Sequence, residues 1–482
     1  MHSQAARMPE KTAVYSHDHT MTYRQWDEAS DRLAQWFVAQ GLRPGDRVAV
    51  HWCNSMDAAQ LFFGIFKAGL IVVPVNLRLK APEIAYQLRH SGAVMCFSQP
   101  ALAPLAEQAR AENPALQLYT SLPEFAGAAP LPAIDEDNPA IILYTSGTTA
   151  QPKGTTHTHR TACETVRQIG HGLLNESDIV LSVTSFMHTT GLLCNLLQAI
   201  YLGASASFLP AFNAGGVLDT IERFRCTYLV ALPALLQFVV EEQVRCPRDV
   251  SSLRCVIAGG DTVPVSLQER FQQHFGIPCP EVYGMTESLP VSINPPEAIR
   301  PGSIGKPSVE LRIVDLQDRE VPPGEVGEIV VRSSSNTIGY WNDEAATAAL
   351  LRGGWLHTGD LGNLDSDGYL WFKGRLKQII IRAGSNISPQ DVEEAIYRHP
   401  AVLEAGVIGV PDLVYGERVV AFVALRAGST AAEGELIAYA RTRLADYKVP
   451  ENIYFLDELP KGITGKVQRR ALKDLLPRAA GA

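Results

Sequence analysis

The sequence predicts an α/β protein with a large amino-terminal domain of wound α/β layers and a smaller α+β domain at its carboxyl end. Three observations lead to this fold class. A chain of 482 residues is too long for one hydrophobic core, so it needs at least two domains. Short apolar runs alternate with amphipathic stretches as far as Tyr283, which is typical of largely parallel sheets wound with helices. From about Val309 onward, short strands and turns replace this alternation.

The first long helix is marked at both ends. Thr22 and Gln25 can form a capping box, Trp26 begins an apolar stripe, and Gly41 can end the helix. The same criteria predict further helices over residues 58–68 and 82–91, and strands over residues 46–52, 69–75, 93–98, 141–144, 179–184, 206–209, 227–232, 255–258 and 281–283.

The rest of the chain is predicted to form two units. A β-rich subdomain covers about residues 309–374, and a domain boundary is expected at residues 374–378. The remaining residues, 375–482, form a carboxyl-terminal domain of ordinary size. In it, Ser388 and Pro389 begin a helix, strands are expected at 402–410 and 419–425, and a second helix at 433–444.

Composition and charge exclude several classes of protein. With 42 basic and 51 acidic side chains the formal charge is −9, so nothing favours a nucleic-acid partner. Eight cysteines without a CxxC pair are expected to be buried thiols of a reducing compartment, which favours a cytoplasmic location. No apolar leader segment is seen, and polar residues interrupt the most apolar runs, 61–75 and 191–209. We therefore expect core segments and no membrane span.

The stretch that first points to chemistry is IILYTSGTTAQPKGTTHTH, residues 141–159. A buried strand passes into a loop of hydroxyls and glycines that ends at Lys153. Such a loop can direct N–H and O–H groups toward one point, and the lysine can neutralise an anion there, so it suits a polyphosphate. It differs from the usual Walker pattern because Gly154 follows the lysine. Taken alone, the stretch fits a flexible surface loop equally well.

Five further patches are ordinary when taken singly. They are EVYGMTE at 281–287, AGGD at 258–261, HTGD at 357–360, GRLK at 374–377 and GITGK at 462–466. Tyr283 could stack on a purine, Glu287 could hold Mg²⁺, and Asp360 could accept the hydroxyls of a ribose. Each patch also has a plain structural interpretation: a buried tyrosine with a solvated carboxylate, two turns, a basic hinge and a surface lysine.

In this order and spacing, YTSGTTAQPKG, YGMTE, TGD, GRLK and GKVQRR resemble the adenylate-forming superfamily, in particular its acyl- and aryl-CoA synthetases. The resemblance covers about residues 22–475. It implies an AMP-binding domain over residues 1–374 that includes a distorted β-barrel subdomain. It also implies a mobile lid domain over residues 375–482, with its hinge at Lys377. The substrates and cofactors implied are ATP, Mg²⁺, coenzyme A and a small carboxylic acid.

The resemblance also implies a role for each candidate residue. Contacts to the β- and γ-phosphates are implied for Thr145, Ser146, Gly147, Thr148, Thr149 and Lys153, contacts to adenine for Gly260, Asp261, Glu281, Val282, Tyr283 and Gly284, and contacts to ribose for Asp360 and Arg375. Thr286 would meet the α-phosphate, Glu287 the Mg²⁺, and Lys466 both the α-phosphate and the substrate carboxylate. Ala383 and Gly384 would line a pantetheine tunnel, which His188 would separate from the acid pocket. Ala150 and Ile381 depart from the usual glycine and lysine, so no nucleotide contact is assigned to Ile381.

The expected reaction has two halves, adenylation of a carboxylic acid and transfer of the acyl group to coenzyme A. Segments 186–193, 228–233 and 285–291 contain no arginine, which favours a monocarboxylic acid with an apolar tail, medium-chain fatty or aromatic. A ligase that loads a carrier protein in trans, a malonate or oxalate CoA ligase, and a ligand-sensing relative without activity remain alternatives. The sequence is compatible with a homodimer and with acetylation of Lys466, and it decides neither.

Overall fold

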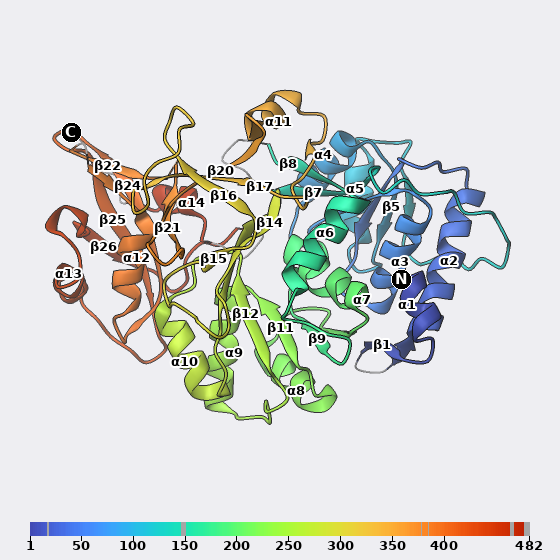
Figure 1. Cartoon of the computed structure of the whole chain (residues 1–482), viewed down its shortest axis with the longest axis horizontal. Coiled ribbons are helices and arrows are strands. Elements are labelled where there is room, and N and C mark those ends of the chain that lie inside the picture. Colours follow the sequence, from blue (N-terminus) through green and yellow to red (C-terminus); the bar gives the residue numbers. More distant parts are fainter. Residues whose placement is uncertain (17–18, 146–150, 377, 384, 463–466, 477–482) are drawn as a thin grey trace.

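The computed structural model describes residues 1–16, 19–145, 151–376, 378–383, 385–462 and 467–476. Figure 1 shows the amino-terminal layers, coloured blue to green, on one side of the molecule and the carboxyl-terminal unit, coloured orange to red, on the other. None of the helices in these ranges combines the length and the apolar character that crossing a bilayer requires.

The first sheet has seven strands in the order β18-β8-β7-β4-β3-β5-β6. Its strands are β3 (Arg47–His51), β4 (Ile71–Pro74), β5 (Ala93–Ser98), β6 (Gln117–Tyr119), β7 (Pro139–Thr145), β8 (Lys153–Thr158) and β18 (Gly339–Tyr340), and the helices along this part of the chain are α1 (His2–Arg7), α2 (Tyr23–Ala39), α3 (Met56–Lys67), α4 (Ala81–Ser91) and α5 (Ala103–Arg110). The predicted capping box is present at the start of α2, between Thr22 and Gln25. Strand β8, which the sequence interpretation treated as loop, pairs antiparallel with β7.

The second sheet has nine strands in the order β15-β14-β13-β12-β11-β9-β10-β1-β2. They are β1 (Thr12–Tyr15), β2 (Thr20–Thr22), β9 (Ile179–Ser182), β10 (Ser205–Phe208), β11 (Tyr228–Ala231), β12 (Cys255–Gly259), β13 (Glu281–Met285), β14 (Ser288–Ile293) and β15 (Lys306–Pro307), with α6 (His159–Gly170), the π-helix η1 (Thr190–Leu197), α7 (Gln198–Leu202), α8 (Ala214–Phe224), α9 (Pro233–Arg245) and α10 (Val265–Phe275) between them. The pairs from β1 through β10, β9, β11 and β12 to β13 are parallel, as predicted. One apolar cluster contains Val48 of the first sheet and Phe208 of the second, so the two sheets share a core.

The predicted β-rich region forms a five-stranded antiparallel sheet. It contains β16 (Glu310–Val314), β17 (Gly327–Arg332), β19 (Leu351–Arg352), β20 (Trp355–Leu364) and β21 (Leu370–Arg375), with helix α11 (Glu344–Leu350) beside it. The chain enters a different sheet after β21, which is where the domain boundary is predicted.

The carboxyl-terminal sheet follows the order β23-β22-β25-β24, and β26 pairs with β25. Its elements are β22 (Ile380–Arg382), β23 (Ser385–Ile387), α12 (Pro389–Tyr397), β24 (Val402–Asp412), β25 (Gly416–Leu425), α13 (Glu433–Arg441), the 3₁₀ helix η2 (Asp446–Lys448), β26 (Asn452–Phe455) and α14 (Arg469–Asp474). Ser388 caps α12 by accepting from the backbone N–H of Asp391, and Pro389 is the first helical residue, as the sequence predicts.

The prediction that all eight cysteines are buried is wrong in part. All eight are free thiols, and five of them are buried, but Cys53 is half-buried and Cys163 and Cys246 are exposed. Cys163 lies on a solvent-facing position of α6, and Cys246 follows the last residue of α9, so neither position is covered by the core.

Candidate active site

The hairpin of β7 and β8 brings Thr145 and Lys153 together. These residues are cross-strand partners at the loop end of the hairpin, on either side of the hydroxyl-rich segment. The Lys153 ammonium lies 4.8 Å from the ring centroid of Tyr340, over its face. The candidates Ser146, Gly147, Thr148 and Thr149 lie outside the described residues. The flanking pair therefore fixes where the predicted phosphate loop begins and ends.

Glu287 lies close to this end of the hairpin. Its Oε1 accepts a hydrogen bond from the Tyr340 hydroxyl at 2.9 Å and a longer one from the Thr155 hydroxyl at 3.4 Å. The residue is only 6% exposed, and burial raises the pKa of its carboxyl. A carboxylate whose close partners are neutral hydroxyls is a suitable ligand for a hard cation such as Mg²⁺, since the cation would offset the cost of burying the charge.

Thr286 joins three segments that are distant in sequence. Its carbonyl accepts from Nε2 of His157 in β8 at 2.8 Å, and its hydroxyl lies 2.8 Å from that of Thr189. Burial lowers the pKa of His157, which favours the neutral imidazole. His188 lies directly before Thr189, and its Nδ1 accepts from the N–H of Thr190 at the start of η1. The predicted acid-pocket segment therefore meets the end of β13.

Tyr283, Asp360 and Arg375 form a second group along the same edge. The Tyr283 hydroxyl donates to Oδ2 of Asp360 at 2.8 Å, and Arg375 Nε lies 3.2 Å from Oδ1. Asp360 and Arg375 are cross-strand partners in β20 and β21. Burial, together with the neighbouring Asp360 charge, raises the pKa of Tyr283, so the phenol stays protonated and remains a donor.

The glycines at the end of β12 allow a close approach to β13. A Cβ on Gly259 would lie 2.5 Å from the Val282 side chain, and Gly260 has φ +86°. Gly284 is equally confined, with the Leu289 side chain 2.4 Å from a Cβ placed on it. Glu281 is buried, and burial raises the pKa of its carboxyl well above the usual value. Gly259 and Gly284 therefore let β12, β13 and β14 pack closely, and the contact of this region with adenine stays a prediction.

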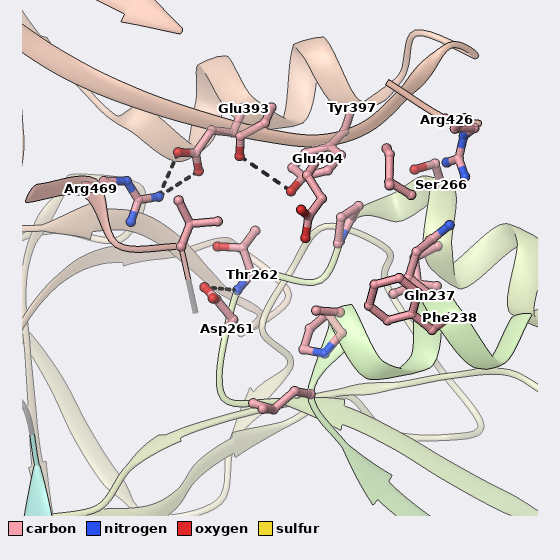
Figure 2. A pocket seen from close by; sticks show the side chains of 18 residues that line it. Gln237, Phe238, Asp261, Thr262, Ser266, Glu393, Tyr397, Glu404, Arg426 and Arg469 are labelled. Carbon is pink, nitrogen blue, oxygen red and sulfur yellow. Dashed lines mark hydrogen bonds and ion pairs between the residues drawn. The ribbon is translucent and has the colours of Figure 1, made fainter. Parts of the chain in front are cut away.

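Asp261 is placed differently from its neighbours. Its Oδ1 accepts from the N–H of Thr262 at 2.9 Å, and both residues line a pocket between α9, α10 and the carboxyl-terminal domain. Figure 2 shows Asp261 in this pocket together with Arg469, whose guanidinium forms a double hydrogen bond with Glu393 at 2.7 and 2.8 Å. Asp261 therefore faces the carboxyl-terminal domain.

The candidates of the carboxyl-terminal domain are described only in part. Ala383 has φ +48° and donates its backbone N–H to the carbonyl of Tyr415 at 2.7 Å. Lys377, Gly384 and Lys466 lie outside the described residues. Their predicted roles stay predictions.

Four residues that contact the candidates were not singled out from the sequence. They are Thr155, His157, Thr189 and Tyr340. A signal for two of them lies in GTTHTH at 154–159, where polar side chains follow one another in a strand whose residues from Gly154 to Thr158 are buried. Buried polar residues in a strand need partners, and here the partners belong to the site.

Comparisons with known proteins show which family the chain belongs to. The family model for AMP-binding enzymes matches residues 1–341, and the model for the AMP-binding enzyme C-terminal domain matches residues 391–466. Sulfoacetate–CoA ligase of Cupriavidus necator is 34% identical over 489 residues, covering 97% of this chain and 96% of its own length. Feruloyl-CoA synthase of an Amycolatopsis species is 36% identical over 473 residues, covering 96% and 95%. The crystal structure of anthranilate CoA ligase AuaEII with anthranoyl-AMP has a TM-score of 0.94 at 31% identity, covering 98% and 96%.

The chain therefore belongs to the AMP-binding enzyme family, and its fold is that of the adenylate-forming enzymes. It is an AMP-forming acyl-CoA ligase, a class that uses ATP, Mg²⁺ and coenzyme A.

Proposed function

We propose that this enzyme activates a monocarboxylic acid with an apolar tail, medium-chain or aromatic, and transfers it to coenzyme A. The observation that carries the proposal is the convergence of three groups along one edge: Thr145 with Lys153, Thr286 with Glu287, and Tyr283 with Asp360. In this order, the three groups would contact the β- and γ-phosphates, the α-phosphate with Mg²⁺, and the ribose of one nucleotide.

In the first half-reaction, a carboxylate oxygen of the acid bonds to the α-phosphorus of ATP, and the bond to pyrophosphate breaks. Lys153 neutralises charge on the outer phosphates, and Asp360 orients the ribose with Arg375. Glu287 would hold Mg²⁺, which would supply charge neutralisation at the phosphates. The predicted role of Lys466 is to bridge the acid and the α-phosphate.

In the second half-reaction, the coenzyme A sulfur bonds to the acyl carbon, the bond to AMP breaks, and the thiol proton is released. We propose that the carboxyl-terminal domain turns about Lys377 between the halves, so that Lys466 leaves and Ala383 with Gly384 approach. His188 would then separate the acid pocket from the thiol path.

The choice of acid rests on the residues around the Thr189–Thr286 contact. Apart from His188 and Glu287, segments 186–193, 228–233 and 285–291 are apolar or carry hydroxyls, and none contains an arginine or a lysine that could meet a second anionic group. The relatives are named for sulfoacetate, feruloyl and anthranilate substrates, so similarity alone does not select among acids.

A pyrophosphate-release assay over a panel of acids tests this choice. Hexanoate, octanoate and benzoates should be preferred over malonate, oxalate and sulfoacetate. A strong preference for malonate, oxalate or sulfoacetate would refute the proposed choice of acid.

Titration of coenzyme A against a phosphopantetheinyl carrier protein separates the proposed acceptor from a carrier loaded in trans.

The two-step scheme is tested with Lys466→Ala. Because Lys466 is assigned to the first half only, the variant should lose adenylate formation from acid and ATP by about a hundredfold or more. It should still form thioester from supplied acyl adenylate at the wild-type rate. Equal loss in both halves would contradict the proposed alternation.

We propose a cytoplasmic location, because eight free thiols suit a reducing compartment. A homodimer would be detected by light scattering of the purified chain.

A further inference from the structure

The turn that carries Asp360 is a bulge in the pairing of β17 and β20. Glu328 is the partner of Leu361 and Val330 is the partner of His357, so Thr358, Gly359 and Asp360 all lie opposite Ile329. Gly359 has φ +70°, which bends the bulge sharply. Bulges beside active sites commonly redirect a side chain, and here the redirected side chain is the Asp360 carboxylate.

Glu328 contacts this bulge from β17, the strand opposite it. Its Oε1 accepts from the backbone N–H of Gly359 at 3.0 Å, and its Oε2 lies 3.0 Å from Nδ1 of His357. Thr358 completes the bulge, because its hydroxyl donates to the Ile329 carbonyl and accepts from the N–H of Asp360. A single carboxylate therefore contacts both the residue that opens the bulge and the residue that precedes Asp360.

Glu328 is itself contacted by Arg352. Arg352 Nη2 lies 3.0 Å from Asp318 Oδ1 and 3.4 Å from Glu328 Oε2. Ligand atoms of Asp318, Glu328 and His357 lie within 4.8 Å of one another, an arrangement that could also surround a metal ion. Arg352 already supplies a positive charge beside the two carboxylates.

We propose that Glu328 is a positioning residue for Asp360. Glu328 accepts from the Gly359 N–H and so sets the direction in which the Asp360 carboxylate faces the nucleotide ribose. Tyr283 and Arg375 contact that carboxylate directly. This inference rests on the proposed function, because it takes Asp360 as the ribose ligand. An error of about 1 Å in such a ligand can cost up to a hundredfold in rate.

The test compares ATP with 2′,3′-dideoxy-ATP, which lacks both ribose hydroxyls. Wild type should prefer ATP, and Asp360→Ala should lose the preference. Glu328→Ala should lose most of it, with kcat/KM for ATP lowered about ten- to a hundredfold and KM for the acid unchanged. The exposed Glu325→Gln, three residues away in the same segment, is the matched control and should behave as wild type.

Two conservative variants distinguish the hydrogen bond to Gly359 from the negative charge beside Arg352. They also keep the proposal testable if Glu328→Ala does not fold. Glu328→Gln keeps an oxygen that can accept from Gly359 and should retain the preference for ATP. Glu328→Asp keeps the charge beside Arg352 but is too short to reach Gly359, and it should lose the preference. The reverse pattern would overturn the positioning role.

The outcomes for Asp360 and Glu328 distinguish the two levels of inference. Undiminished preference for ATP in Asp360→Ala would show that the ribose assignment itself is wrong. Loss of preference in Asp360→Ala together with full retention in Glu328→Ala would leave that assignment standing and refute the role of Glu328.

Discussion

Glu287 combines an unfavourable burial with a proposed functional charge. Burial raises the pKa of its carboxyl, and the hydroxyls of Tyr340 and Thr155 compensate only part of that cost. The folded protein therefore holds the Glu287 proton up to a higher pH than the unfolded chain does. As pH rises from the unfolded pKa through the raised folded pKa, ionisation of Glu287 costs stability.

We therefore predict that removal of the Glu287 charge raises stability and lowers activity. Glu287→Gln removes the buried charge but keeps an acceptor for Tyr340, so its Tm should exceed that of wild type at pH 8 and approach it at pH 5. Adenylate formation should fall about a hundredfold, as for other lost charged contacts to the transition state. Mg²⁺ with ATP should raise the Tm of wild type more than that of the variant. Equal Tm differences at both pH values would contradict the assigned titration.

At the residue scale, the motifs predicted the ligand-facing side chains but not what holds them. Tyr283, Glu287 and Asp360 follow from their place in short motifs at strand ends. Their partners do not, because Thr155 is separated from Glu287 by 132 residues and Tyr340 by 53. Such pairs are set by tertiary packing, which no local pattern encodes.

At the element scale, helices with clear caps were predicted well, and strands without apolar alternation were not. Helix α2 begins directly after Thr22 and ends at Ala39, two residues before Gly41, because the capping box and the glycine are local signals. Strand β8 was missed because three threonines and His157 occupy buried positions in it, where apolar residues are expected.

The contact between α2 and α3 gives a prediction at this scale. A Cβ on Gly64 in α3 would lie 2.6 Å from Cβ of Leu33 in α2, so Gly64→Ala forces the two helices apart. The free energy of unfolding should fall by about 1–3 kcal/mol, as for other overpacked cores. Denaturant unfolding measures it. Gly434→Ala in α13, where a Cβ meets open space, is the control and should be neutral or slightly stabilising. Equal effects at both sites would show that helix propensity, and not the close contact, governs Gly64.

At the scale of the whole molecule, the orientation of the carboxyl-terminal domain depends on contacts that the sequence could not predict. Glu241 in α9 accepts from Arg426 of that domain at 2.6 Å and from Arg270 of α10 at 2.9 Å. Glu241 and Arg426 are 185 residues apart. Burial alone would raise the pKa of Glu241, but the two arginines leave it lowered, so the residue is ionised at neutral pH. This ion pair joins the two domains beside the pocket that contains Asp261 and Arg469.

In the proposed two-step reaction, weakening this ion pair should act unequally on the two halves. Val467 and Arg469, which closely follow Lys466 in sequence, line the same pocket as Asp261, and we propose that this orientation serves adenylation. Glu241→Gln leaves Arg270 and Arg426 facing each other and should destabilise the orientation. Because Glu241 is 41% exposed, the effect on adenylate formation should be modest, about two- to fivefold, and smaller at high salt. Thioester formation from supplied acyl adenylate should be unchanged or faster.

Glu242→Gln, which disturbs only the pair with Arg245 within α9, controls for loss of a charge on the same helix. A parallel decline of both half-reactions in Glu241→Gln would mean that the ion pair supports the fold and does not select a domain orientation.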